Sequence, residues 1–334
     1  MYAPLHHKYR PQTFAELVGQ DAIAATLTNA ITSQRLAPAY LFTGPRGTGK
    51  TSSARILAKS LNCLNEGQPT PNPCGQCASC QAVTSGSSLD VIEIDAASNS
   101  GVEQVRDLIE KCQFSPLLGR LKVFIIDEVH AITGAAAQAL LKTLEEPPAH
   151  VIFILCTTEP QKLPNTILSR CQRFNFRRLG LDAMVNHLQA IATAEKIPIT
   201  EEAIRLVAQI ANGGLRDAQT LLDQLSLLEG SIAPRQVWAL VGTVPEAELL
   251  ELMQAIASDE PQTVIKWVRN LLDQGKEPLI VLQNLTEFYT NLLIAKTSPN
   301  SQELINVTEG IWEKLKEVAD TLEVTTILTG QQHL

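Results

Sequence analysis

The most specific chemistry in this 334-residue chain is offered by an eight-residue loop of the form G-x-x-x-x-G-K-S/T. In such a loop the glycines let the backbone curl so that consecutive N–H groups point at a β-phosphate. Lys50 would neutralise β- and γ-phosphate charge, and the Thr51 hydroxyl would bind Mg²⁺. The sequence therefore predicts a nucleoside triphosphate site. Its expected contacts are Gly44, Pro45, Arg46, Gly47, Thr48, Gly49, Lys50, Thr51 and Ser52.

Two acidic residues at the end of an apolar run form a second chemical element. Residues 122–126 have the continuous apolar character of a buried parallel strand, and Asp127 and Glu128 follow them. Acids at the carboxyl end of such a strand face the ligand crevice of an open α/β sheet. We expect Asp127 to orient Mg²⁺ and Glu128 to polarise a water for hydrolysis, which favours an ATPase over a phosphotransferase.

Further polar groups are expected near the same site. Strand 151–156 should deliver Thr157 and Thr158 to the same sheet edge, where a hydroxyl can sense the γ-phosphate or hold the water. Arg170 has no obvious partner in its own nucleotide site, and Arg216 starts a helix that could reach over the nucleotide. Arginines act on transferring phosphates in cis or in trans. Either arginine alone is more typical of a surface or ion-pair residue, so the order of the motifs carries the argument.

That order resembles the AAA+ clamp-loader ATPase family. The phosphate-binding loop is followed by the acid box Asp-Glu-Val-His, the threonines, Ser-Arg-Cys at 169–171 and Gly-Leu-Arg-Asp at 214–217. The resemblance covers residues 8 to about 245 closely and the remainder loosely. Other segments that carry it are 9–11, 18–20, 94–98, 140–148 and 157–164.

The resemblance implies a role for each matching residue. Lys50 and Thr51 would bind ATP and Mg²⁺, Asp127 would also hold Mg²⁺, and Glu128 would be the catalytic base. Thr158 would be the first sensor, because it lies four residues before Lys162.

The resemblance also assigns the two arginines. Arg216 would be the second sensor, and Arg170 would act on the ATP of a neighbouring subunit. The residues expected around adenine and ribose are Arg10, Pro11, Val18 and Gln20.

Four of the seven cysteines follow the loop helix with the spacing C-x10-C-x2-C-x2-C, at Cys63, Cys74, Cys77 and Cys80. Four thiolates at such spacing suit a closed tetrahedral Zn²⁺ site, and disulfides are the competing interpretation. We favour zinc because no signal peptide or transmembrane run is present and an ATPase works in a reducing compartment. The family resemblance implies the same module. The other cysteines, expected in the core or at its edge, are Cys112, Cys156 and Cys171.

Composition and pattern predict an α/β fold with helical additions. The chain is 45% hydrophobic but only 4% aromatic, which suggests two or three domains. We expect a P-loop parallel-sheet core at 1–179 with a zinc module at 63–80, a helical lid at 180–243, and an all-α region at 244–334. The family resemblance implies that the core is of the AAA+ kind and that the last region is an oligomerisation collar. The chain is expected to end inside or just after that collar. The helices predicted after the core are 182–195, 201–211, 215–228, 246–257, 261–274, 278–295 and 309–328.

Charge is divided unevenly along the chain. Residues 1–179 contain 17 Lys and Arg against 14 Asp and Glu, whereas the rest contains 10 against 21. Because affinity for duplex DNA rests on Lys and Arg, any DNA contact must come from a local basic face of the first domain. Lys142 is either such a contact or a solvated surface lysine.

The resemblance implies an ATP-driven motor subunit of the bacterial DNA polymerase III clamp loader, without a polymerase active site of its own. Its cofactors would be ATP, Mg²⁺ and Zn²⁺, and its location the cytoplasm. The implied partners are delta-type and delta-prime-type subunits, further copies of itself, the sliding clamp (beta) and primer-template DNA.

Two other functions remain open. One is an AAA+ DNA-remodelling ATPase of the Holliday-junction helicase type. Such a protein should form hexamers and translocate, and it would not be expected to carry the cysteine insertion or Ser-Arg-Cys. The other is a scaffold subunit with a dead nucleotide site. The intact residues Lys50, Thr51, Asp127 and Glu128 argue against a dead site.

Overall fold

The structure is a computed structural model that describes residues 2–99, 101–132, 134–242, 244–273, 275–298 and 311–333. The chain forms two compact units. The first contains the residues up to Glu195 together with Ile210–Asp223, and the second contains Lys196–Gln209 together with the residues from Gln224 onward.

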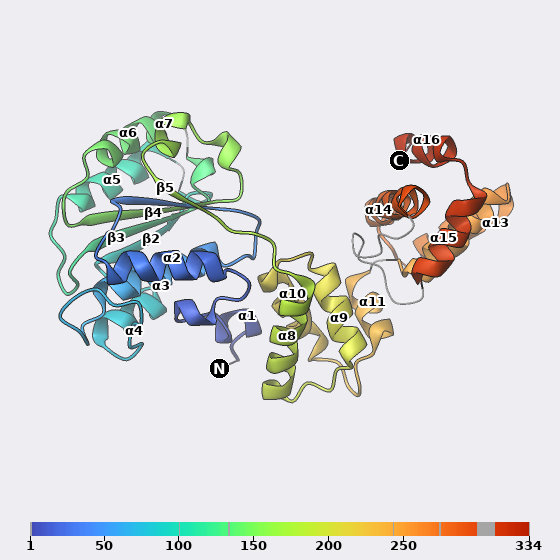
Figure 1. Cartoon of the computed structure of the whole chain (residues 1–334), viewed down its shortest axis with the longest axis horizontal. Coiled ribbons are helices and arrows are strands. Elements are labelled where there is room, and N and C mark those ends of the chain that lie inside the picture. The colour runs from blue at the N-terminus through green and yellow to red at the C-terminus, as the bar shows by residue number, and fades with distance from the viewer. Residues whose placement is uncertain are drawn as a thin grey trace. The chain divides into compact units, whose positions relative to one another are not determined.

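The first unit is built on a five-stranded parallel sheet with the order β2-β3-β4-β1-β5 (Figure 1). The strand that leads into the phosphate-binding loop, β1, therefore lies between β4 and β5. Parallel strands end at one edge, so the loops after β1, β3 and β4 converge there. The strands are β1 (Ala39–Thr43), β2 (Val91–Asp95), β3 (Lys122–Asp127), β4 (Val151–Thr157) and β5 (Gln172–Asn175).

Helices cover both faces of the sheet, which explains why its central strands are continuous apolar runs. Along β1, Tyr40 and Phe42 pack into one core cluster with α2 (Asp21–Thr32) and α3 (Lys50–Asn62). Leu41, between them, belongs to a second cluster on the opposite face. The helices of that second cluster include α5 (Val102–Cys112) and α6 (Gly134–Glu145). The predicted α/β core with a parallel sheet is confirmed.

The other elements of the first unit are short, apart from two helices that follow the sheet. Most of α10 belongs to this unit. The α-helices are α1 (Leu5–Lys8), α4 (Ala78–Ser85), α7 (Asn165–Leu168), α8 (Leu181–Glu195) and α10 (Leu215–Leu225), and the 3-10 helices are η1 (Phe14–Glu16), η2 (Val129–Ala131) and η3 (Pro160–Lys162).

Polar contacts fix the N-terminal segment against the rest of this unit. The Lys59 ammonium, buried on α3, donates to the Gln12 carbonyl at 3.0 Å and to Gln12 Oε1 at 2.7 Å. Lys8 forms a 2.6 Å ion pair with Glu195 at the end of α8, and Tyr9 donates to the same carboxylate. The segment is therefore held between the loop helix and α8, where it can line a site.

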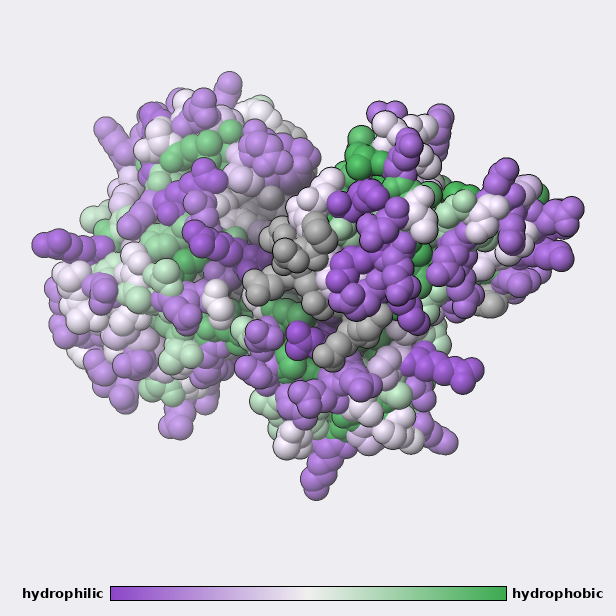
Figure 2. Space-filling view, turned by 45° about the vertical axis from the view of Figure 1, so that its right-hand side comes forward, coloured by the Kyte–Doolittle hydropathy of each residue, from purple (hydrophilic) through white to green (hydrophobic). Residues whose placement is uncertain are grey.

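Among its described residues, the regular elements of the second unit are all helices, and one isolated parallel bridge joins Ile199 to Ile232. Its core gathers side chains such as Leu250, Phe288, Leu292, Trp312 and Leu315. Figure 2 shows that hydrophilic side chains cover much of the visible face of the molecule, with apolar residues in smaller areas. The helices are α9 (Glu201–Ile210), α11 (Pro234–Val241), α12 (Glu246–Ala257), α13 (Pro261–Asp273), α14 (Pro278–Thr297), α15 (Ile311–Thr321) and α16 (Val324–His333).

One predicted helix is wrong in its extent. The part of the predicted 309–328 helix that the structure describes forms two helices, α15 and α16, with a break at residues 322–323. The break lets Leu315 of α15 and Ile327 of α16 pack into the same core cluster. The predicted end of the 261–274 helix at Gln274 and the predicted start at Glu309 lie outside the described residues.

In the parts of the chain that the structure describes, no helix combines the length and the apolar character needed to span a membrane. The division into core, lid and collar at 179 and 243 remains a prediction.

Candidate active site

The phosphate-binding loop connects β1 to α3 through three glycines with positive φ, namely Gly44 (145°), Gly47 (75°) and Gly49 (99°). The curl brings the Lys50 ammonium onto two loop carbonyls, those of Gly44 at 2.8 Å and Pro45 at 2.7 Å. Burial lowers the pKa of Lys50. An anionic ligand bound in the loop would therefore contact the Lys50 ammonium, which is partly desolvated and already points into the loop.

Gly44 is the loop position with the least space, and its replacement gives a stability prediction. A Cβ at Gly44 would lie 2.3 Å from the Phe176 carbonyl oxygen, on a backbone with φ near 145°. We expect Gly44→Ala to lower the free energy of unfolding by about 3 kcal/mol, measured by denaturant titration. Gly180→Ala is the control, because Gly180 has open space and no positive φ. Equal stability of the two variants would contradict the tight fit.

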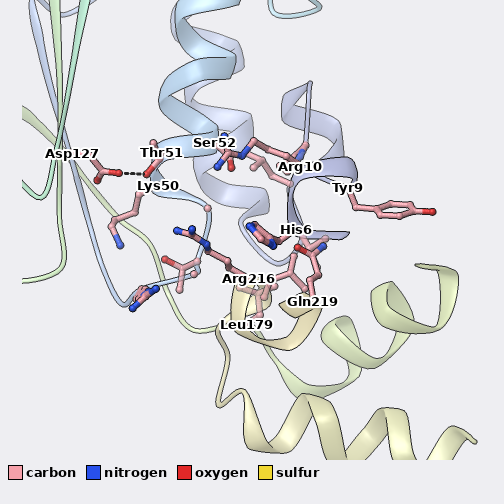
Figure 3. Close-up of a pocket in the computed structure, with 18 of the residues that line it drawn as sticks. His6, Tyr9, Arg10, Lys50, Thr51, Ser52, Asp127, Leu179, Arg216 and Gln219 are labelled. Atoms are coloured by element: carbon pink, nitrogen blue, oxygen red, sulfur yellow. Dashed lines mark hydrogen bonds between the residues drawn. The ribbon is translucent and has the colours of Figure 1, made fainter. Parts of the chain in front are cut away.

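The first acid reaches the loop as predicted. The Thr51 hydroxyl at the start of α3 donates to Asp127 Oδ2 at the end of β3, at 2.7 Å (Figure 3). A hydroxyl and a carboxylate are hard oxygen ligands of the kind that Mg²⁺ prefers, often together with phosphate oxygens. The two residues thus fit a Mg²⁺ ion bound with a nucleotide.

The second acid is held by the predicted sensor. Glu128 has a left-handed backbone (φ 46°), which turns the chain away from the strand. Its Oε2 accepts hydrogen bonds from the backbone N–H and the hydroxyl of Thr158, at 3.2 and 3.0 Å. The neighbouring hydroxyl, that of Thr157, is buried and contacts His130 instead. The structure therefore brings Thr158, and not Thr157, onto the acid expected to activate water.

A cavity of about 440 Å³ opens beside these residues (Figure 3), a size typical of small-ligand sites. Lys50, Thr51, Asp127, Glu128 and Arg216 all line it. The other predicted lining residues are Arg10, Pro11, Val18, Arg46, Gly47, Thr48, Gly49 and Ser52.

Gln20 supports the cavity from outside and does not line it. Gln20 is only 4% exposed. The amide nitrogen donates to the Arg177 carbonyl at 2.8 Å and, more weakly, to the Thr48 carbonyl at 3.5 Å. Gln20 therefore ties the loop to the chain that leaves β5. Gly44 and Pro45, which hold Lys50, also lie outside the cavity lining.

Several lining residues were missed by sequence reasoning. Tyr9, Asp95, Ala97 and Leu215 lie in segments that carried the family resemblance, so that resemblance was the available signal. No local pattern marks the others, which come from the N-terminal segment, from the chain just before α8, and from α8 and α10. These are His6, Glu16, Leu17, Leu179, His187 and Gln219.

The two predicted arginines occupy different places. Arg216 enters the cavity (Figure 3) because the Leu215 N–H donates to the Gly47 carbonyl at 3.1 Å, which docks the start of α10 on the loop. Arg170 does not line the cavity. Its guanidinium pairs with Glu145 at 2.6 Å and donates to the Thr166 carbonyl at 2.7 Å.

The four clustered cysteines lie together after α3, with all four sulfur atoms within 4.8 Å of one another. Zn–S bonds of about 2.3 Å would place the sulfurs of a tetrahedral site roughly 3.8 Å apart. All four are free thiols, so the disulfide interpretation finds no support. Burial opposes ionisation of Cys77, but N–H groups of Cys80 and Leu64 outweigh it and lower the pKa of Cys77 to about 6. The cluster thus fits a thiophilic metal ion.

Two side chains anchor this cluster to the sheet. Asn62 at the end of α3 accepts from the N–H groups of Arg120 and Leu121, both at 2.9 Å, just before β3. The Arg120 guanidinium donates to the Cys63 carbonyl at 2.8 Å. Outside the cluster, Cys112 and Cys156 are buried and Cys171 is partly buried, as predicted.

The parallel sheet with β1 inserted between β4 and β5, together with the loop and acid pair at its carboxyl edge, defines a P-loop protein of the AAA+ class. A solved structure agrees at the level of fold. The Holliday junction branch migration motor RuvB of Thermotoga maritima aligns with a TM-score of 0.52 and 17% identity, over 74% of this chain and 79% of that one.

Models of three protein families match successive parts of the chain. They are described as DNA polymerase III, delta subunit (19–180), DNA polymerase III clamp loader subunit, ATPase lid domain (183–231), and DNA polymerase III subunits gamma and tau domain III (232–331).

Full-length relatives give the same result. DNA polymerase III subunit tau of Bacillus subtilis is 44% identical over 316 residues, which are 94% of this chain and 54% of that protein. The corresponding subunit of Escherichia coli is 40% identical over 341 residues, covering 100% of this chain and 52% of that protein. The chain belongs to the family of bacterial DNA polymerase III gamma/tau subunits, which confirms the resemblance. It spans about half the length of these relatives.

Proposed function

We propose that this chain is an ATP-driven motor subunit of the DNA polymerase III clamp loader, which uses ATP binding and hydrolysis to load a sliding clamp onto primed DNA. One observation carries the proposal: Lys50, Thr51, Asp127 and Glu128 line a single cavity in a member of the gamma/tau family. The chain itself contributes ATPase chemistry and no polymerase site.

The site residues divide the work of hydrolysis. Lys50 would exchange the carbonyls of Gly44 and Pro45 for phosphate oxygens, which are stronger, charged acceptors. Thr51 and Asp127 would hold Mg²⁺, which when bound neutralises charge on the phosphates. Thr158 would keep Glu128 in place to polarise the attacking water.

The arginines would connect subunits. Arg216 would contact the phosphates of its own nucleotide, closing the lid and setting the angle of the neighbouring subunit. Arg170, which lies outside this chain's cavity, would complete the neighbour's site after leaving Glu145. Arg10, Pro11 and Val18 would contact the base and sugar, with Gln20 supporting the loop behind them.

The partners follow from the family. They are delta-type and delta-prime-type subunits and further copies of this chain, working in the cytoplasm on the sliding clamp and primer-template DNA. Lys142 is exposed on α6 and stays a candidate DNA contact.

ATP turnover in a reconstituted complex tests the function. The chain would be mixed with delta-type, delta-prime-type and sliding-clamp subunits, with and without primed DNA. The Lys50→Ala variant would give the ATP turnover that does not depend on this site. Strong stimulation by clamp and primed DNA that disappears in Lys50→Ala is the expected result. Turnover indifferent to both would point to another AAA+ role, and no turnover would favour a scaffold.

The cysteine cluster is a structural zinc site in this proposal, holding the insertion rigid. We expect purified protein to carry about one zinc ion per chain, and Cys80→Ser to lose it, as measured by elemental analysis. Cleavage of residues 64–73 by protease should then accelerate at least about tenfold, because the loop loses its cross-link. ATP binding should persist, since Lys50 lies at the other end of α3.

Cys112→Ser is the matched control for the zinc prediction. Its thiol is buried but lies outside the cluster, so metal content should not change. Unchanged zinc in Cys80→Ser would contradict the assignment of the four ligands.

A further inference from the structure

A histidine that sequence reasoning left without a role lies beside the proposed catalytic base. His130 is in the short helix η2, two residues after Glu128, and its side chain is only 16% exposed. His130 lies close to Glu128 but does not itself line the cavity. Any effect on the reaction would therefore act through another residue.

Both ring nitrogens of His130 are engaged. Nδ1 lies 2.9 Å from the Thr157 hydroxyl and 3.3 Å from Glu128 Oε2. Nε2 lies 3.3 Å from Glu159 Oε1, and the Glu159 carboxylate is itself paired with Lys162 at 2.8 Å. The imidazole is thus fixed on two sides, which restricts its rotation.

Thr157 makes the inner side of this arrangement rigid. Its hydroxyl is fully buried and also accepts the Glu159 N–H at 3.0 Å. The ring of His130 therefore rests on a group that belongs to the end of β4 and cannot move independently of the sheet.

The consequence for Glu128 is asymmetric. Its Oε2 meets the Thr158 N–H, the Thr158 hydroxyl and His130 Nδ1. In the described part of the chain, no protein hydrogen bond engages Oε1 of this carboxylate. One oxygen is held and the other is left for a water molecule, the arrangement that orients a general base.

We propose that His130 is a positioning residue for Glu128, fixing Oε2 through Nδ1 so that Oε1 faces the attacking water. This inference rests on the proposed ATPase function. Thr158, directly after β4, holds the same oxygen by two hydrogen bonds, and His130 approaches it from η2 at 3.3 Å, so the base is braced from two sides. The Glu159 contact at Nε2 serves to keep the ring in this orientation.

A pair of amide variants tests which nitrogen matters. An asparagine amide reaches the level of Nδ1, whereas a glutamine amide reaches the level of Nε2. In the reconstituted complex we expect His130→Asn to keep kcat within about twofold and His130→Gln and His130→Ala to lower it about tenfold. KM for ATP should stay within about twofold in all three, because His130 itself does not line the cavity.

A double variant separates positioning from general structural damage. If His130 acts through Glu128, His130→Ala should have no further effect on turnover in a Glu128→Gln background. An additional tenfold loss in that background would overturn the inference, as would His130→Gln turning over faster than His130→Asn.

His150→Asn is the matched control. His150 contacts the carbonyls of Cys112 and Phe114, both at 3.1 Å, before β4 and away from the acid pair. Its kcat should equal that of wild type. If His130→Ala turned over ATP as fast as wild type, the inference about His130 would be overturned and the proposed function would stand. A wild-type complex without turnover would overturn the proposed function and the inference with it.

Discussion

Glu128→Gln is expected to lower ATP turnover about 1000-fold while leaving ATP affinity within about threefold. Glutamine keeps the volume of the side chain and a carbonyl oxygen that can still accept from Thr158. Its neutral amide cannot take a proton from water or polarise it as a carboxylate does. The loss should therefore appear in the chemical step and not in binding.

Single-turnover hydrolysis in the reconstituted complex, with nucleotide binding measured separately, would resolve these two effects. Glu110→Gln is a suitable control because Glu110 is an exposed acid of α5, outside the cavity lining. It should behave as wild type. Turnover of Glu128→Gln within tenfold of wild type would show that another group activates the water.

Arg170→Ala is expected to lower DNA-stimulated turnover by about 1000-fold in the complex, with each subunit still binding ATP. Arg170 lies outside its own chain's cavity, so its removal should leave that nucleotide site intact. The guanidinium would instead be missing from the neighbour's site, where in the proposed mechanism it would stabilise charge in the transition state. In this structure Arg170 pairs with Glu145, which is exposed, and breaking an exposed ion pair costs little free energy.

Arg173→Ala controls for loss of a nearby positive charge. Arg173 is exposed on β5 and donates to Asn175 at 2.8 Å. Its turnover should match that of wild type. The trans role of Arg170 would be refuted by an Arg170→Ala complex that hydrolyses ATP normally, or by an Arg170→Ala chain that has lost ATP affinity on its own.

Much of the fold was predictable because its strongest signals are local. The strands predicted at 122–126 and 151–156 are recognisable as apolar runs because helices cover both faces of the sheet. In the structure each strand is one residue longer than predicted. The helix after the phosphate-binding loop runs from Lys50 to Asn62, the position that such a loop requires. The 309–328 helix was wrong because apolar spacing alone does not reveal a break that lets two helices share one core.

The site also contains residues that the sequence could not place correctly. Gln20 was expected in the pocket because of its place in an N-terminal motif, yet its amide holds two backbone carbonyls. His6, His187 and Gln219 enter the cavity from three separate helices, and no periodicity or spacing connects them.

By itself, the sequence determined the chemistry: a phosphate-binding loop, two acids after a buried strand and four cysteines at metal-ligand spacing. Within each of these motifs the residues lie a few positions apart, so their spacing is enough to identify it. Only the tertiary structure decided that Thr158 meets Glu128, that Arg216 enters the cavity and Arg170 does not, and that His130 lies beside Glu128. These contacts join residues on different strands and helices, and strand order and helix docking set such distances.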